Sequence, residues 1–230
     1  LEEREDVVDN LLKDKSSQFE ALVEEARGML GSIPESWIGN APMQTSPEHV
    51  ESLELLVEAL AGGEYTTVEE YDDAIVLLNE AMDNVAFLNE PDPDKLYNIR
   101  HISGLNLSCA NGLTLEEVIE GDLEQCFSLI AVEGERNCYN IYSNGYYLSV
   151  DDTGEGMFMF SDTPRGNNGR FVVTQAGSNS FTLSSISGLV GVHAVDAGAP
   201  AVPDASDGEH NSLWTIVETD GNVGTGIVDH

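Results

Sequence analysis

The chain has 230 residues, 41% of them hydrophobic, which is enough for one or two domains with buried cores. Asp and Glu outnumber Lys and Arg by 42 to 9, and the resulting net charge of −33 repels phosphate backbones and anionic membrane surfaces. Nucleic acid is therefore excluded as an expected partner, and no apolar run approaches the roughly 18 residues of a membrane span, so we expect no membrane insertion.

Residues 1–90 are predicted to form an acidic three-helix bundle. Apolar residues recur near the 3.6-residue period over residues 2–30, where Gly31 and Pro34 end the first helix. Ser46 followed by Pro47 predicts the start of a second helix, and the capping-box spacing of Thr67-Val68-Glu69-Glu70 predicts the start of a third. Three amphipathic helices with short connections can close around one core.

The third predicted helix resembles the FIVAR modules, small three-helix units found along bacterial surface proteins. The residues that carry the resemblance are Thr67, Tyr71, Ala74, Leu78 and Ala81. It implies a spacer or adhesive module in a surface protein. The chain also begins inside a charged helical pattern, so we expect it to be a piece of a longer secreted or cell-surface bacterial protein.

A short linker separates this half from a repetitive second half. Pro91 and Pro93 forbid helix and stiffen residues 91–95. From there the sequence repeats: Tyr97, Tyr139 and Phe181 each open a strand-like run, 42 residues apart. Each unit closes on an aromatic residue followed by aliphatics, at Phe127, Phe171 and Trp214.

Three units of four short strands cannot each bury an apolar face, but three of them around an axis can. The sequence therefore predicts an α plus all-β protein of two domains, in which a three-helix bundle is followed by a β-trefoil of three four-strand repeats at residues 96–220. Residues 221–230 form a tail or the start of a further linker. The six repeat aromatics are expected to pack in the trefoil core.

This half resembles the ricin-type lectin repeats, which carry Gln-x-Trp on the last strand of each unit. Gln125-Cys126-Phe127 keeps the glutamine and an aromatic residue, whereas Gly169-Arg170-Phe171 and Ser212-Leu213-Trp214 keep only the aromatic. The resemblance implies a sugar pocket built from an aspartate, an aromatic residue and an asparagine. Ser108 and Glu124 stand at the aspartate and asparagine positions of the first unit, so that pocket is expected to be inactive.

The implied pocket residues lie in the second and third units: Asp151 or Asp152, Phe158 or Phe160, and Asn168, and then Asp196 and Asn211. A carboxylate accepts sugar hydroxyls, an aromatic face covers the C–H side of a sugar ring, and an amide bridges a further hydroxyl. The same residues have a second interpretation. Asp151-Asp152-Thr153-Gly154 is also an ordinary turn sequence, and Phe158 and Phe160 alternate with methionines as a buried hairpin would.

No catalytic motif, cofactor site or metal site is predicted. The histidines lack helical metal-site spacing, and the three cysteines lack the spacing of a zinc site. Cys109, Cys126 and Cys138 are expected to be buried thiols, with a Cys126–Cys138 bridge as the alternative.

The sequence thus favours a non-catalytic carbohydrate-binding region of a larger protein, with a glycan or polysaccharide as partner and contacts to other domains of the parent protein. The alternative is a protein-interaction or spacer module whose trefoil pockets are degenerate. A third candidate is a protease-inhibitor trefoil that uses the loop at residues 198–206.

Overall fold

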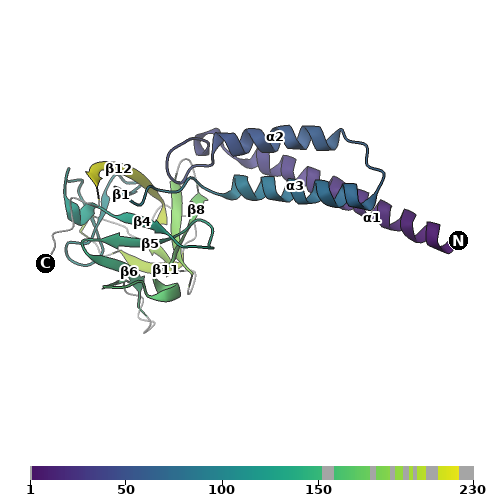
Figure 1. Ribbon diagram of the computed structural model, residues 1–230. Helices are drawn as coiled ribbons and strands as arrows, with labels where there is room; N and C mark the ends of the chain where they lie inside the picture. Colours follow the sequence, from purple (N-terminus) through teal and green to yellow (C-terminus); the bar gives the residue numbers. More distant parts are fainter. Residues whose placement is uncertain are drawn as a thin grey trace. The chain divides into compact units, whose positions relative to one another are not determined.

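The computed structural model of the protein describes residues 2–151, 158–176, 180–186, 190–193, 197–198, 201–205 and 212–222. The chain divides into two compact units, Leu1–Asn89 and Glu90–His230. The first unit is helical and the second is built of strands (Figure 1). Among the helices of the described residues, none has the length and hydropathy needed to cross a membrane.

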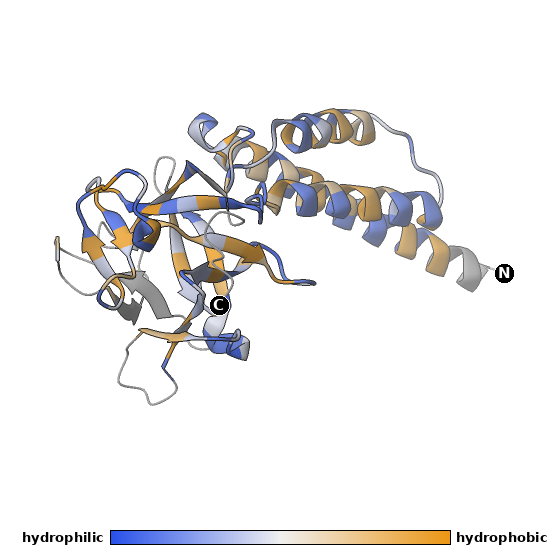
Figure 2. Ribbon diagram, turned by 60° about the vertical axis from the view of Figure 1, so that its left-hand side comes forward, coloured by the Kyte–Doolittle hydropathy of each residue, from blue (hydrophilic) through white to orange (hydrophobic). Residues whose placement is uncertain are grey.

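The first unit is the predicted three-helix bundle, with α1 (Glu2–Ser32), α2 (Pro47–Ala61) and α3 (Val68–Ala86). Each helix packs against the other two. The apolar stripes of the ribbon in Figure 2 correspond to a core drawn from all three helices. Its buried members are Phe19, Val23, Ala26, Leu53, Val57, Ala74, Leu78 and Val85.

The first turns of α1 extend past the bundle, which the sequence pattern did not indicate (Figure 1). Val8 and Leu11 belong to the apolar stripe but are 59% and 47% exposed, and from Val7 onward, where side chains are described, Phe19 is the first buried residue. The reason is length: α1 has 31 residues, whereas α2 and α3 have 15 and 19. At about 1.5 Å per residue, neither partner helix can cover the whole of α1.

The predicted start of α3 is confirmed in detail. Thr67 Oγ1 accepts from the Glu70 amide at 3.2 Å, and a Glu70 carboxylate oxygen accepts from the Thr67 amide at 3.0 Å, which closes the capping box. α2 begins after Ser46 with proline in its first turn, but the Ser46 side chain makes no capping hydrogen bond. Proline lacks an amide hydrogen, so α2 has one fewer donor to satisfy at this end.

The second unit contains twelve strands among the described residues. They are β1 (Lys95–His101), β2 (Asn106–Ser108), β3 (Thr114–Glu116), β4 (Ser128–Ala131), β5 (Cys138–Ser143), β6 (Tyr146–Val150), β7 (Phe158–Ser161), β8 (Phe171–Ala176), β9 (Ser180–Ser185), β10 (Val190–His193), β11 (Val202–Ala205) and β12 (Trp214–Asn222). All their pairings are antiparallel.

Six of these strands close into a barrel. The order of neighbours is β1, β4, β5, β8, β9 and β12, and β12 returns to β1. The β1–β4 step is a single bridge, in which Tyr97 and Phe127 exchange two backbone hydrogen bonds of 2.8 Å. The remaining strands form three hairpins, β2–β3, β6–β7 and β10–β11, one for each repeat. This barrel with three hairpins is a β-trefoil, as the period predicted.

The six repeat aromatics are paired across strands within each repeat. Tyr97 lies opposite Phe127, Tyr139 opposite Phe171, and Phe181 opposite Trp214. All six are at most 4% exposed, so the expected packing role is confirmed. Because directly opposite residues share one face of a sheet, each repeat contributes one ring pair to the common interior.

The capping box gives α3 a pH-dependent contribution to stability. The backbone amides of Thr66 and Thr67 hold the pKa of Glu70 below its ordinary value. A carboxyl group whose pKa is lowered by folding stabilises the folded state above its unfolded pKa, and this contribution is lost as the pH falls through the folded pKa. We expect an NMR titration of the Glu70 carboxyl carbon to show the lowered pKa. Glu70→Gln retains the acceptor and should flatten the acid limb of the stability curve, whereas an ordinary Glu70 pKa would contradict this account.

The six buried repeat aromatics, which we call the ring layer, should make the largest contribution to the stability of the trefoil. Phe171 is fully buried, and Phe171→Ala should lower the free energy of unfolding by about 3–5 kcal/mol through lost burial and the cavity left behind. Tyr146, at 48% exposure, provides the control, and Tyr146→Ala should change stability by less than about 0.5 kcal/mol. Urea unfolding followed by Trp214 fluorescence in a Trp37→Phe background measures both. Equal effects of the two variants would exclude the ring layer as the main support.

Candidate carbohydrate-binding site

The strand register identifies the equivalent positions of the three repeats. Each repeat has a cross-strand pair whose first member lies three residues after the first aromatic of that repeat. These pairs are Arg100–Asn106, Tyr142–Tyr147 and Ser184–Gly191. Counting two residues on from the second member of each pair gives Ser108, Ser149 and His193 as equivalent positions. Ser149 is therefore the counterpart of Ser108, and its side chain is fully buried. Asp151 lies two residues further on and is half-buried.

A short turn of 3₁₀-helix, η3 (Gly166–Gly169), covers one face of the second repeat. Asn140 on β5 donates to the Gly169 carbonyl at 2.7 Å, and a Cβ on Gly169 would come within 3.8 Å of the Ser149 Cβ. Asn168, the predicted amide, is half-buried in this turn. Side chains alternate along a strand, so Tyr147 and Ser149 of β6 share one face, which is the face that Gly169 of η3 approaches. Asp151 follows directly after the end of this strand.

The predicted aromatics of this site lie on the opposite face of the β6–β7 hairpin. Phe158 pairs with Val150 and Phe160 with Leu148, and both partners are buried. The Phe158 ring centroid is 6.5 Å from that of the core residue Phe171. The contact with Phe171 agrees with the buried-hairpin interpretation for Phe158, but Phe158 and Phe160 are both only half-buried.

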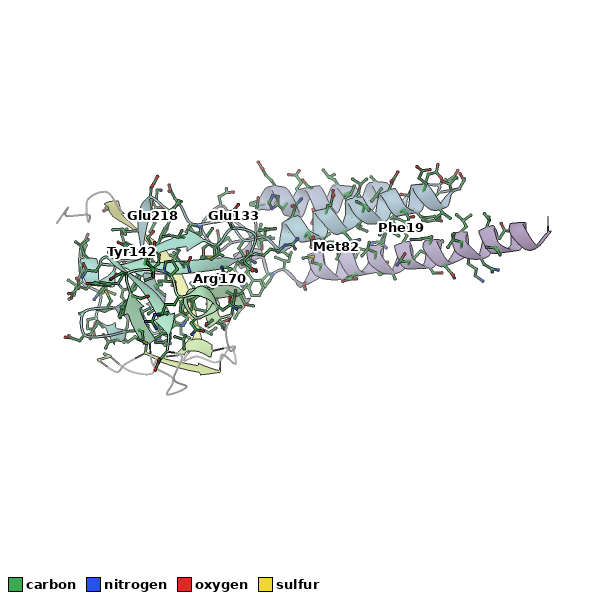
Figure 3. The ribbon with its side chains drawn as sticks, turned by 60° about the horizontal axis from the view of Figure 1, so that its bottom comes forward. Phe19, Met82, Glu133, Tyr142, Arg170 and Glu218 are labelled. Atoms are coloured by element: carbon green, nitrogen blue, oxygen red, sulfur yellow. The ribbon has the colours of Figure 1, made fainter. Side chains whose placement is uncertain are left out.

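A tyrosine pair that the sequence reasoning missed lies on the η3 side. The rings of Tyr142 and Tyr147 have centroids 4.9 Å apart and an interplanar angle of 58°, and both residues are half-buried. Figure 3 marks Tyr142 on β5. The signal for this pair was the Asn144-Gly145 dipeptide. Both residues have positive φ, as a two-residue hairpin turn requires, and that turn sets Tyr142 opposite Tyr147.

The second repeat therefore carries a ring pair on β5 and β6, an acid just after β6 and an amide in η3. The corresponding partners are Arg100 and Asn106 in the first repeat, where Arg100 Nε donates to the Asn106 amide oxygen at 2.9 Å. In the third repeat they are Ser184 and Gly191. Of the other predicted residues, Asp152, Asp196 and Asn211 lie outside the described residues, and so does part of the loop at residues 198–206.

The single glutamine of the degraded Gln-x-Trp pattern is fully buried. Gln125 Nε2 donates to the Glu117 carbonyl at 2.7 Å, and Gln125 Oε1 accepts from the Asn106 amide group at 3.0 Å and from the Ile119 backbone amide at 3.2 Å. Its amide thus anchors the connection between β3 and β4. Gly169 and Ser212 stand at this position in the other repeats and cannot replace it.

The chain matches no family model and no curated protein, but solved structures match its trefoil unit. The designed threefold-symmetric protein ThreeFoil is 17% identical, with 53% of this chain and 97% of that chain covered and a TM-score of 0.48. A Polyporus squamosus lectin bound to a human-type influenza-binding epitope is 14% identical, with 56% and 50% covered and a TM-score of 0.47.

An endo-β-galactosidase from Clostridium perfringens is 12% identical, with 55% of this chain and 33% of that chain covered and a TM-score of 0.47. The assignment of the C-terminal unit as a β-trefoil rests on its own strand pairing and its three hairpins. No comparison bears on the helical unit, whose resemblance to FIVAR modules stays a prediction.

The described residues offer neither a metal cluster nor an activated thiol. No group of three or more His, Cys, Asp or Glu among them could hold a metal ion. Cys109, Cys126 and Cys138 are all free thiols, so the alternative Cys126–Cys138 bridge is not formed. Burial raises the pKa of each of them, most simply because a thiolate loses hydration there. Neutral, buried thiols are poor nucleophiles.

The thiols should therefore resist alkylation in the native protein. We expect iodoacetamide at pH 7.5 to modify half-buried Cys109 slowly, and Cys126 and Cys138 only after unfolding. Because the pKa of Cys109 is raised, its rate should keep increasing with pH beyond the range of an ordinary thiol. Mass spectrometry of the labelled peptides gives the rates. Rapid native labelling of any of the three, or a disulfide in the intact chain, would contradict this assignment.

Proposed function

We propose that the trefoil binds a glycan non-covalently on the η3 side of its second repeat. The observation that carries the proposal is the Tyr142–Tyr147 pair, which stands only in this repeat. Asp151, just after β6, and Asn168, in η3, belong to the same repeat and are both half-buried. Half-buried aromatic rings give a sugar an apolar surface to cover, and the neighbouring carboxylate and amide can accept and donate hydrogen bonds to its hydroxyl groups.

We also propose a wider role, which the sequence suggested. The chain acts as the carbohydrate-binding region of a larger secreted or cell-surface bacterial protein and performs no catalysis itself. The acidic bundle serves as a spacer in the same chain. One shallow site binds weakly, so useful affinity depends on several sites held together in a parent protein.

The alternative is a protein-interaction or spacer module with degenerate pockets. It is favoured by the inward packing of Phe158 and by the buried serines at the two equivalent positions Ser108 and Ser149. The two functions differ in one respect, since a spacer does not bind sugars through Tyr147.

A glycan array followed by titration calorimetry tests the proposal. Tyr147→Ala and Asp151→Ala should each weaken binding of the best array glycan about tenfold or more, which corresponds to roughly 1.4 kcal/mol. Tyr146→Ala, which removes the exposed neighbouring ring, should leave the affinity within about twofold. Absence of any bound glycan, or equal binding by all four proteins, would leave the interaction or spacer module as the function.

A further inference from the structure

The connection between β3 and β4 is unlike its counterparts in the other repeats. We call residues 116–125 the acidic–apolar loop, because it holds five acids, three large aliphatic residues and no base. Val118, Ile119 and Leu123 are 46%, 58% and 51% exposed. The equivalent connection of the second repeat, residues 162–170, contains no large aliphatic residue, and neither do residues 206–212 of the third. Trefoil packing therefore does not require aliphatic residues here.

Hydrogen bonds from the buried Gln125 side chain and from backbone groups hold the backbone of the acidic–apolar loop in place. The Gln125 side chain accepts from the Ile119 amide and donates to the Glu117 carbonyl. The Asp122 amide donates to the Ile119 carbonyl at 3.3 Å within the loop. The amide of Cys109, which follows β2, donates to the Glu124 carbonyl at 2.8 Å. Held in this way, the loop displays its aliphatic side chains without having to order on binding, which lowers the entropic cost of an interaction.

The turn also brings the backbone at Ile119 close to that at Asp122 and Leu123. The Asp122–Ile119 hydrogen bond closes a tight turn, and Leu123 follows it directly at the start of η2 (Leu123–Gln125). Exposed aliphatic residues that cluster on a rigid loop and are bordered by charge are typical of protein-interaction surfaces.

The five acids of the loop determine which charge a partner should carry. Glu116, Glu117, Glu120, Asp122 and Glu124 surround the aliphatic residues. A second copy of this chain would bring the same five acids against them, and an anionic membrane would meet like charge, so both are disfavoured. We propose that the acidic–apolar loop binds a cationic amphipathic segment of a partner protein, with apolar side chains on the loop aliphatics and Lys or Arg on the acids. This interaction is separate from glycan binding by the second repeat.

The test uses the full chain and a synthetic amphipathic helix of alternating leucine and lysine clusters, with a serine–lysine peptide of equal charge for comparison. The leucine–lysine peptide should bind at least about tenfold more weakly to Val118→Ser/Ile119→Ser than to the wild type, as measured by fluorescence anisotropy. Val76→Ser/Leu77→Ser, on the exposed face of α3, is the matched control and should bind like the wild type. The serine–lysine peptide should not distinguish the three proteins.

An NMR map on the wild type makes the test independent of the variants. Amide shifts on adding the leucine–lysine peptide should concentrate at residues 116–125. Shifts spread over the acidic surface, or equal affinity for wild type and Val118→Ser/Ile119→Ser, would overturn the proposal and indicate non-specific attraction to the net charge of −33. Preferential binding to anionic vesicles over the peptide would also overturn it. A glycan bound by the wild type should be unaffected by the loop variant.

Discussion

The structure of the second unit depends on the pairing of two aromatic rings across strands within each repeat. The pairs Tyr97–Phe127, Tyr139–Phe171 and Phe181–Trp214 occupy the same register three times. One repeat alone would leave its pair half in water, whereas three together close a barrel that has no free edge. Because each ring pair fixes which residues of its strands face inward, it also fixes which residues face outward. The positions of the surface groups on these strands therefore follow from the register of the ring pairs.

The inward positions repeat, but the outward positions differ, and this difference separates packing from function. On the strand face opposite the ring pairs, the three repeats carry the cross-strand pairs Arg100–Asn106, Tyr142–Tyr147 and Ser184–Gly191. The connections that follow the third strands differ in the same way, with aliphatic residues in the first repeat and polar residues in the second. A single scaffold thus presents several independent surfaces, and the chemistry of each must be argued from its own side chains.

The period in the sequence was enough to predict the trefoil, because spacing along the chain determines which rings meet in the core. The capping box of α3 was equally visible, since all of its partners are local. The candidate site was predicted less well. Whether Phe158 faces the core depends on its partner across the hairpin, Val150, and Tyr142 and Tyr147 become a pair only once the Asn144 turn sets their register. The exposed start of α1 depended on the lengths of α2 and α3, which periodicity in α1 cannot reveal.

Charge distinguishes the two proposed surfaces on this strongly acidic chain. The acidic–apolar loop has five acids and no base over ten residues, so its field attracts cations and repels anions. The connection at residues 161–170 instead has one acid, Asp162, and two of the nine bases of the chain, Arg165 and Arg170. This connection therefore has a net charge of +1, from two bases and one acid, against −5 for the acidic–apolar loop. Neutral polyols are held by ring contact and directional hydrogen bonds rather than by net charge, so the proposed glycan site does not need the strong negative charge on which the acidic–apolar loop depends.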